Sequence, residues 1–361
     1  MTMNPNKESN KSTCEIHQHL FFVSSPLHLI CANVLASTIM KNKCCRLFFL
    51  KPELENMISN HIWESVSFLP WPRHFPVKGL FGRHRRTLNN LKLVRESVYN
   101  AEFITLYMPV IDSEAYNYNI LLAKSITGVL PEVCLIPDGL LNIRKYDQGR
   151  IREIGKLFRK LRYLISPSLN YYLFKGDRTG SDDSIVKKIY VFPNIPNEYD
   201  AKKTVSLDIV DAIQKGKVTE NNIDKALIVG QPLSTNNGFD DKGIDMVSEA
   251  IYDTLNDFGI SKVDYKPHPR DKNKCLFKEG YNELDLDIPL EFYLIDNPYK
   301  VVIGVYSTAL LMVRLLDETC SVISIYPDLV RYKKVGMSRD ILNLFEQAGV
   351  QIIYFSKRKR T

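Results

Sequence analysis

Short apolar runs alternate with amphipathic stretches along most of the chain, and this alternation starts twice. The first half carries apolar runs at 19–23, 45–50, 102–108, 132–136 and 188–192. The second half restarts with runs at 225–229, 262–266, 300–305, 320–326 and 350–355, and helical spacing fills 243–259, 307–317 and 338–349. Strands that alternate with helices are typical of α/β proteins with parallel sheets, so we expect two α/β units.

The length and the polar stretches give the expected domain organisation. A chain of 361 residues is longer than one hydrophobic core usually organises, which favours two domains. We expect a disordered tail over 1–14, an N-terminal α/β domain over 15–205, a polar linker over 206–222 and a C-terminal α/β domain over 223–361.

Composition narrows the class of protein. With 45% hydrophobic and 25% charged residues, the chain is globular. No uninterrupted apolar run is long enough to span a bilayer, and the polar start MTMNPNKESNKST lacks the apolar core of a secretory signal. The seven cysteines show no paired framework and no Cys-x-x-Cys zinc spacing, so reduced thiols in a cytoplasm are expected.

The net charge of +7 is concentrated in three segments, 82–86, 150–164 and 356–360. In segment 150–164, RIREIGKLFRKLRYL, Ile, Leu and Phe recur at helical spacing between Arg and Lys. That pattern suits a basic helix on an anionic membrane surface or against an anionic partner, and a solvated charged face is the alternative. Zinc-finger spacing, an RNP-like aromatic motif and a convincing helix-turn-helix are missing from the sequence, so no nucleic-acid partner is expected.

Polar, turn-forming clusters follow the expected strands at their carboxyl ends, where open parallel sheets bind ligands. They are Ser24-Ser25-Pro26, Pro137-Asp138-Gly139, Gly230-Gln231-Pro232, His268-Pro269 and Tyr306-Ser307-Thr308. Two sheets that faced each other with these edges would form a cleft with Asp138 on one wall and His268 on the other.

His268 lies between two prolines, which hold the stretch extended and place Lys266 and Arg270 near the ring. An imidazolium at this place can hydrogen-bond a phosphoryl oxygen and act as a general acid. Ser307 and Thr308 stand where a strand turns into a helix, a position that suits a phosphate or an ordinary helix cap. These features indicate a nucleotide phosphate in the second unit.

The Asp138 carboxylate can accept a proton from a hydroxyl nucleophile, although an Asp-Gly pair is also a favoured turn. Gly230 allows a ligand to approach the backbone closely. A carboxylate on one wall and phosphate binders on the other describe transfer from a nucleotide-activated donor to an acceptor hydroxyl.

The ordered motifs PDG, KPHP and YST, with SSPLHL at the first strand and VGQPL in the second unit, resemble the bacterial sialyltransferases and polysialyltransferases. The resemblance covers residues 19 to about 328. It implies a GT-B fold, in which an N-terminal acceptor domain and a C-terminal donor domain, both Rossmann-like, face each other across the active-site cleft. It also implies metal-independent, inverting transfer of a nonulosonic acid from a CMP-activated donor to a glycan hydroxyl in capsule, lipopolysaccharide or O-antigen synthesis, without a cofactor.

Carried over residue by residue, the resemblance implies Asp138 as the general base and His268 as the residue that contacts and protonates the leaving phosphate. The implied donor contacts are Gly230, Gln231, Pro232, Lys266, Pro269, Glu291, Ser307 and Thr308, and the implied cleft or acceptor residues are Ser24, Ser25, Gly139 and Asn142. The family has an acidic pair where this chain has Pro137-Asp138, so one carboxylate is missing and the identity of the base stays open.

Other classes of protein stay open as well. Asp285 and Asp287 have the Asp-x-Asp spacing of metal-dependent glycosyltransferases, although they lie in an acidic loop without a preceding strand. A non-catalytic nucleotide- or glycan-binding subunit of a surface-polysaccharide assembly complex, or a transferase for CMP-activated Kdo, legionaminic or pseudaminic acid, fits the same features. The expected location is cytoplasmic, with peripheral attachment to the inner face of the membrane through the basic segments and a glycan or glycolipid acceptor.

Overall fold

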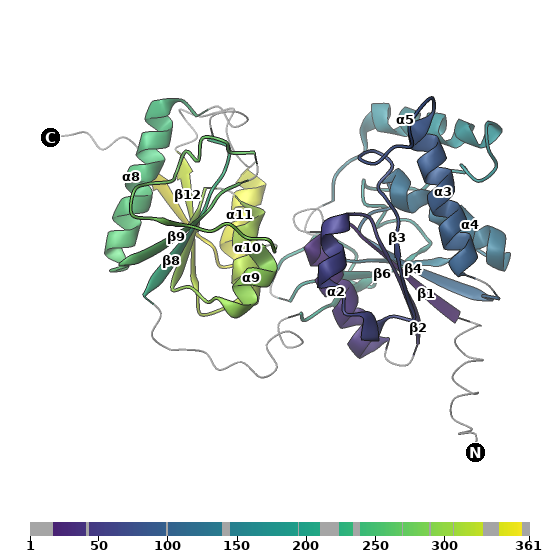
Figure 1. Ribbon diagram of the computed structural model, residues 1–361, viewed down its shortest axis with the longest axis horizontal. Coiled ribbons are helices and arrows are strands. Elements are labelled where there is room, and N and C mark those ends of the chain that lie inside the picture. The colour runs from purple at the N-terminus through teal and green to yellow at the C-terminus, as the bar shows by residue number, and fades with distance from the viewer. Residues whose placement is uncertain are drawn as a thin grey trace, which may run out of the picture. The chain divides into compact units, whose positions relative to one another are not determined.

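The chain divides into two compact units, coloured from purple to teal and from green to yellow in Figure 1. Unit 1 comprises Met1–Pro193 and Asn197–Ile209, and unit 2 comprises Asn194–Pro196 and Val210–Thr361. This computed structural model describes residues 17–40, 43–98, 100–138, 145–193, 195–209, 224–233, 239–268, 270–288, 290–305, 307–327 and 339–355. The expected tail and residues 210–222 of the expected linker lie outside the described residues.

Unit 1 is built on one parallel sheet with the strand order β3-β2-β1-β4-β5-β6-β7. Its strands are β1 (His17–Val23), β2 (Cys44–Phe49), β3 (Ser65–Phe68), β4 (Phe103–Met108), β5 (Glu132–Leu135), β6 (Val186–Val191) and β7 (Thr204–Ser206). Its α-helices are α2 (Pro26–Val34), α3 (Gly82–Ser97), α4 (Glu114–Thr127) and α5 (Gly149–Leu161).

Unit 2 repeats this architecture with the strand order β10-β9-β8-β11-β12-β13, again in parallel pairs. Its strands are β8 (Lys225–Val229), β9 (Lys262–Lys266), β10 (Asn282–Glu283), β11 (Val301–Gly304), β12 (Ser321–Pro327) and β13 (Gln351–Phe355). Its helices are α8 (Asp241–Asp257), α9 (Leu290–Asp296), α10 (Thr308–Leu316) and α11 (Arg339–Gln347).

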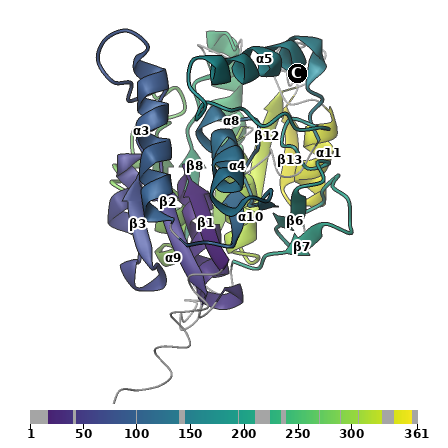
Figure 2. The ribbon, with the colours of Figure 1, turned by 90° about the vertical axis from the view of Figure 1, so that its right-hand side faces the viewer.

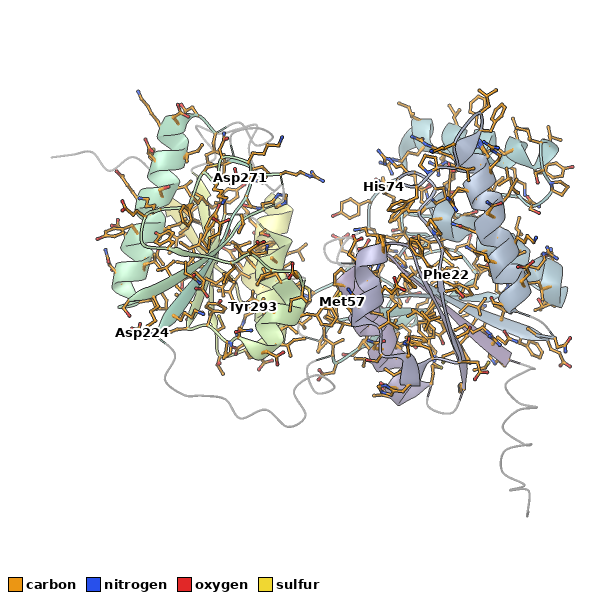
Figure 3. The ribbon with its side chains drawn as sticks, viewed as in Figure 1. Phe22, Met57, His74, Asp224, Asp271 and Tyr293 are labelled. Atoms are coloured by element: carbon orange, nitrogen blue, oxygen red, sulfur yellow. The ribbon has the colours of Figure 1, made fainter. Side chains whose placement is uncertain are left out.

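The core of unit 1 lies on both faces of its sheet, because the central strands are buried at almost every position. Phe22 of β1, labelled in Figure 3, is fully buried and shares one core cluster with Leu91 of α3 and Tyr116 of α4. Its neighbour Phe21 points to the opposite face and stacks on Tyr107, with ring centroids 4.1 Å apart. Figure 2 shows α3 and α4, which contact each other, running alongside this sheet.

Each sheet contains a point at which the strand order reverses. In unit 1 the chain places β2 and β3 on one side of β1 and then continues with β4 on the other side, and in unit 2 the same reversal falls between β8 and β11. Ligands of open α/β sheets bind in the crevice at the carboxyl ends of the strands beside such a point. The fold therefore defines one candidate ligand edge in each unit.

The structure confirms that both halves are parallel α/β units. It adds the helices α3 and α4 and three short edge strands, β3, β7 and β10, which the sequence pattern did not predict. Five cysteines are free thiols (Cys31, Cys45, Cys134, Cys275 and Cys320), whereas Cys44 is disulfide-bonded, so the expectation of reduced thiols is wrong at Cys44. Among the described residues, no helix combines the length and the apolar character needed to cross a membrane.

Candidate active site

His28 and Asp138 form the central contact at the carboxyl edge of unit 1. His28 Nε2 lies 2.8 Å from Asp138 Oδ1. His28 stands in the first turn of α2, which begins directly after β1, and Asp138 follows β5, with β4 between these two strands in the sheet. Parallel strands end at the same edge, so the fold brings two residues that are 110 positions apart together beside the reversal point.

The hydrogen bonds around His28 define which ring nitrogen carries the proton. The backbone N–H of Ser24 donates to His28 Nδ1 over 3.2 Å, and an N–H group can only donate, so Nδ1 is the unprotonated nitrogen. Nε2 therefore carries the proton and donates it to Asp138. Ser25 Oγ accepts from the backbone N–H of His28 and caps α2, and the Tyr116 hydroxyl donates to Ser24 Oγ over 2.7 Å.

The two members of this pair differ in their access to solvent. The His28 side chain is 3% exposed, whereas the Asp138 side chain is 31% exposed. Burial disfavours ionisation of the Asp138 carboxyl, but the hydrogen bond from His28 and the electrostatic interaction with that residue together more than offset this effect and hold the pKa of Asp138 below its ordinary value. Asp138 is therefore ionised at neutral pH and is the member that a substrate can reach, while His28 orients it from behind.

The structure gives Ser24 and Ser25 supporting positions. Ser24 is buried and Ser25 is half-buried, and both contact His28. Gly139 and Asn142, the other expected acceptor residues, lie outside the described residues. The pattern of the sequence did not single out His28 as a site residue. The feature that could have identified His28 is its position in SSPLHL, three residues after the N-cap serine of a helix that starts at a strand end.

In unit 2, His268 follows β9 at the carboxyl edge of the sheet. The backbone N–H of Arg270 donates to His268 Nδ1 over 3.0 Å, so the neutral ring carries its proton on Nε2. Partial burial and the charge of Arg270 hold the pKa of His268 below its ordinary value, and the charge of Asp271 (labelled in Figure 3) acts against them. Pro269 lies outside the described residues.

Ser307 is the N-cap of α10, at the end of β11. Its Oγ accepts from the backbone N–H of Ala309 over 3.3 Å, which leaves the hydroxyl proton able to donate to a ligand. The half-buried Ser307 therefore stands at the positive end of the α10 dipole, where anions bind. Thr308 is the first residue of α10, but its side chain lies outside the described part of the chain.

Packing inside unit 2 accounts for the glycine at the end of β8. A Cβ built at Gly230 would lie 2.5 Å from Tyr265 Oη and 3.0 Å from the Lys266 carbonyl oxygen. That same carbonyl accepts from the backbone N–H of Gly230 over 2.9 Å. Gln231 and Pro232 are buried, so the side chain of Lys266, which is half-buried, is the more accessible of the expected donor contacts at this edge.

The remaining residues that the sequence suggested as site residues are Glu291, Asp285 and Asp287. Glu291 belongs to α9, but its side chain lies outside the described residues. Asp285 and Asp287 are both exposed in the loop after β10, as expected for a solvated acidic loop. The described residues thus gather Ser24, Ser25 and Asp138 around His28 in unit 1. In unit 2, the other described candidates follow β8, β9 and β11, three neighbouring strands.

The architecture is that of known two-domain structures. A UDP-GlcNAc 2-epimerase from Neisseria meningitidis bound to UDP-GlcNAc is similar with a TM-score of 0.51 and 12% identity, over 94% of this chain and 87% of that chain. A second UDP-N-acetylglucosamine 2-epimerase gives a TM-score of 0.51 and 9% identity, over 94% and 83%. At these identities the likeness shows the fold alone, and it confirms the GT-B class with two Rossmann-like domains.

The sequence comparison gives the class of enzyme. Residues 153–326 match the sequence model of a family described as Alpha-2,8-polysialyltransferase (POLYST), which confirms the resemblance expected from the motifs. The protein is thus a glycosyltransferase of the sialyltransferase type. The matched region contains His268 and Ser307 but neither Asp138 nor His28. No curated protein matches the chain significantly.

Proposed function

We propose that the protein transfers a nonulosonic acid from a CMP-activated donor to a hydroxyl of a glycan or glycolipid, with inversion and without a metal ion. The observation that carries the proposal is the ionised, partly exposed Asp138 carboxylate held by the buried His28 at the ligand edge of unit 1. The description of the matched family favours sialic acid as the transferred sugar.

In the proposed reaction, Asp138 accepts the proton of the acceptor hydroxyl while the hydroxyl oxygen forms a bond to the anomeric carbon of the donor sugar. The bond between that carbon and the phosphate oxygen breaks, and its electron pair leaves with CMP. A base that activates the acceptor directly leads to a single displacement, which inverts the anomeric centre. Asp138 is the only carboxylate of its motif, because Pro137 occupies the position of the family's other acid.

On the donor side, we propose that His268 and Ser307 bind the phosphate. Without a ligand the His268 ring is neutral and donates through Nε2. A bound phosphate brings a negative charge close to the ring, which favours the imidazolium form and lets His268 protonate the leaving phosphate. Gly230, Gln231, Pro232, Lys266, Pro269, Glu291 and Thr308 complete the proposed donor surface.

The acceptor is proposed to be a growing surface polysaccharide or lipopolysaccharide, which places the enzyme in the cytoplasm at the inner face of the membrane. In this assignment, Asp138 acts at the carboxyl edge of unit 1 and His268 acts at the carboxyl edge of unit 2. Gly139 and Asn142 are proposed as further acceptor residues.

The proposal is tested with the purified chain and several nucleotides. CMP should raise the apparent melting temperature more than UDP does, because a ligand that binds the native state stabilises it by mass action. CMP-sialic acid should then support transfer to a sialylated oligosaccharide in the presence of a chelator. Equal stabilisation by UDP would contradict the donor assignment. Turnover that needs Mg²⁺ or Mn²⁺ would favour the alternative in which Asp285 and Asp287 bind a metal ion. CMP binding without any transfer would favour a non-catalytic binding subunit.

A further inference from the structure

The helix α5 is amphipathic, and the structure reverses the expected roles of its two faces. Its outer face consists of Ile151, Ile154, Leu157, Phe158 and Leu161, which are 87%, 54%, 56%, 67% and 55% exposed. These positions follow the spacing i, i+3, i+4, i+7 of one helix stripe. The cations between them, which were expected to face an anionic surface, lie on the other side of the helix.

The cationic side of α5 attaches the helix to unit 1. Lys156 is buried and its Nζ donates to the Phe174 carbonyl oxygen over 3.2 Å. Arg159 forms an ion pair with Asp112 at 2.9 Å, and Lys160 Nζ donates to Asn170 Oδ1 over 2.5 Å.

The next turn, η5 (Arg162–Leu164), extends both the charged face that contacts unit 1 and the exposed apolar face. Arg162 pairs with Glu114 at 2.6 Å on the side of unit 1. Leu164 and Ile165 are 71% and 75% exposed. The helix is therefore fixed by its charged residues, and its large apolar side chains are presented to solvent.

A second apolar projection lies at the same end of unit 1. Leu80 and Phe81, directly before α3, are 85% and 70% exposed. Figures 1 and 2 both place α5 and the start of α3 at one end of this unit. Arg83 and Arg85 are exposed in the first turn of α3, and Arg152 of α5 keeps 46% of its side chain exposed although it pairs with Asp112 at 3.8 Å. The apolar residues thus have a cationic border.

We propose that the outer face of α5, together with Leu164, Ile165, Leu80 and Phe81, inserts into the surface of a lipid bilayer with anionic headgroups. Large apolar side chains that are exposed together at one end of a domain mark an interaction site on a protein surface. A bilayer fits better than a protein groove, because the side chains project from a helix and a separate turn and leave the bordering arginines at headgroup level. Insertion here relies mainly on apolar area, with the arginines adding a preference for anionic lipid.

The test is co-sedimentation of the full chain with vesicles of phosphatidylglycerol and phosphatidylcholine. The triple variant Ile154→Gln, Leu157→Gln, Phe158→Gln should lower the partition coefficient roughly a hundredfold or more, because each change removes a large apolar side chain from the inserted face. Gln keeps good helix propensity, and these side chains are exposed, so the fold should be retained. Tyr252→Gln, a change at a 56% exposed apolar residue of α8, is the matched control and should bind like the wild type.

Each outcome decides the proposal. Binding of the wild type that withstands added salt, and loss of binding in the triple variant alone, support it. Equal vesicle binding by the wild type and the triple variant overturns it, as does a wild type that ignores vesicles and dimerises through this face. Transfer to a soluble oligosaccharide should be the same in both proteins, so a failure of this proposal can be told apart from a failure of the proposed function.

Discussion

The buried imidazole of His28 and the partly exposed carboxylate of Asp138 are joined by a hydrogen bond of 2.8 Å between Nε2 and Oδ1. The backbone of Ser24 fixes the ring tautomer, so the carboxylate always meets an N–H donor at this distance. A carboxylate held in this way keeps its direction without a second acid at position 137, where this chain has Pro137. The pair therefore offers a physical substitute for the acidic pair of the resembled family.

Replacement of Asp138 by Asn should abolish most transfer. The amide oxygen can still accept from His28 Nε2, so the local structure is retained, but an amide cannot take the acceptor proton. We expect the transfer rate to fall about 10²–10⁴-fold while CMP still stabilises the protein. Rates measured with a saturating oligosaccharide acceptor check this, and wild-type transfer by Asp138→Asn would exclude Asp138 as the base.

Replacement of His28 by Leu should change the pH dependence of the reaction. Without the donor at Nε2, burial raises the pKa of Asp138, so the acidic limb of the profile of kcat/KM should move to higher pH. His28→Gln supplies an amide N–H and should restore part of the shift. A lower rate with an unmoved acidic limb would mean that His28 is merely structural.

Replacement of His268 by Ala should reduce turnover about 10²–10⁴-fold, because positioned acid catalysis is lost. The exposed His61 is the control, and His61→Ala should behave like the wild type. Equal turnover by the two variants would remove His268 from the catalytic site.

The lowered pKa of His268 gives a second, independent expectation. Donor binding should raise this pKa, so the complex takes up a proton and the affinity for a CMP phosphodiester should increase as pH falls from 8 towards 6. Calorimetric titration of a non-hydrolysable CMP-sugar measures this trend. A trend of the same size in His268→Ala would assign it to another group.

His19 should make unit 1 sensitive to acid. Burial, followed by the charges of His17 and Lys43, lowers the pKa of His19 from 6.5 to about 3. Between these values the unfolded chain binds a proton that the folded chain does not, so stability present above pH 6.5 is lost as pH falls, at about 1.4 kcal/mol per pH unit.

Urea unfolding at several pH values measures this loss through fluorescence, since both tryptophans, Trp63 and Trp71, lie in unit 1. His19→Gln should flatten the slope below pH 6.5, because Gln does not titrate and can still hydrogen-bond the Tyr107 hydroxyl. An unchanged slope would show that His19 is not the responsible group.

The sequence predicted the central strands well because each is long enough to show its own apolar run. β8 and β9 were predicted at 225–229 and 262–266, the bounds that the structure gives. β7 and β10 have three and two residues, and their strand character comes from pairing with β6 and β9. No pattern within so short a segment identifies a strand before its neighbours are placed.

From the sequence, only those site residues could be predicted that directly follow a strand. Asp138 and His268 could be assigned to strand ends because parallel strands end at one edge. The contact of Asp138 with His28 depends on which strands become neighbours, and the sequence does not state this order. Likewise, the periodicity of α5 shows two faces but not which one docks. That choice depends on Asp112, Glu114 and the Phe174 carbonyl, which meet the cations.

The contact between Gly230 and Tyr265 couples two positions in the evolution of unit 2. A methyl group at 230 would collide first with the Tyr265 hydroxyl at 2.5 Å and then with its ring carbon at 2.9 Å. A side chain at position 230 is therefore easier to accommodate after position 265 has lost its tyrosine, although the Lys266 carbonyl oxygen would still lie 3.0 Å away. In diverging relatives we expect the two positions to covary, glycine with tyrosine and larger residues with smaller partners. The glycine of VGQPL would then be retained because the core beside β8 is filled by Tyr265. A substitution of this glycine in a relative would indicate a change in core packing rather than a change in the donor.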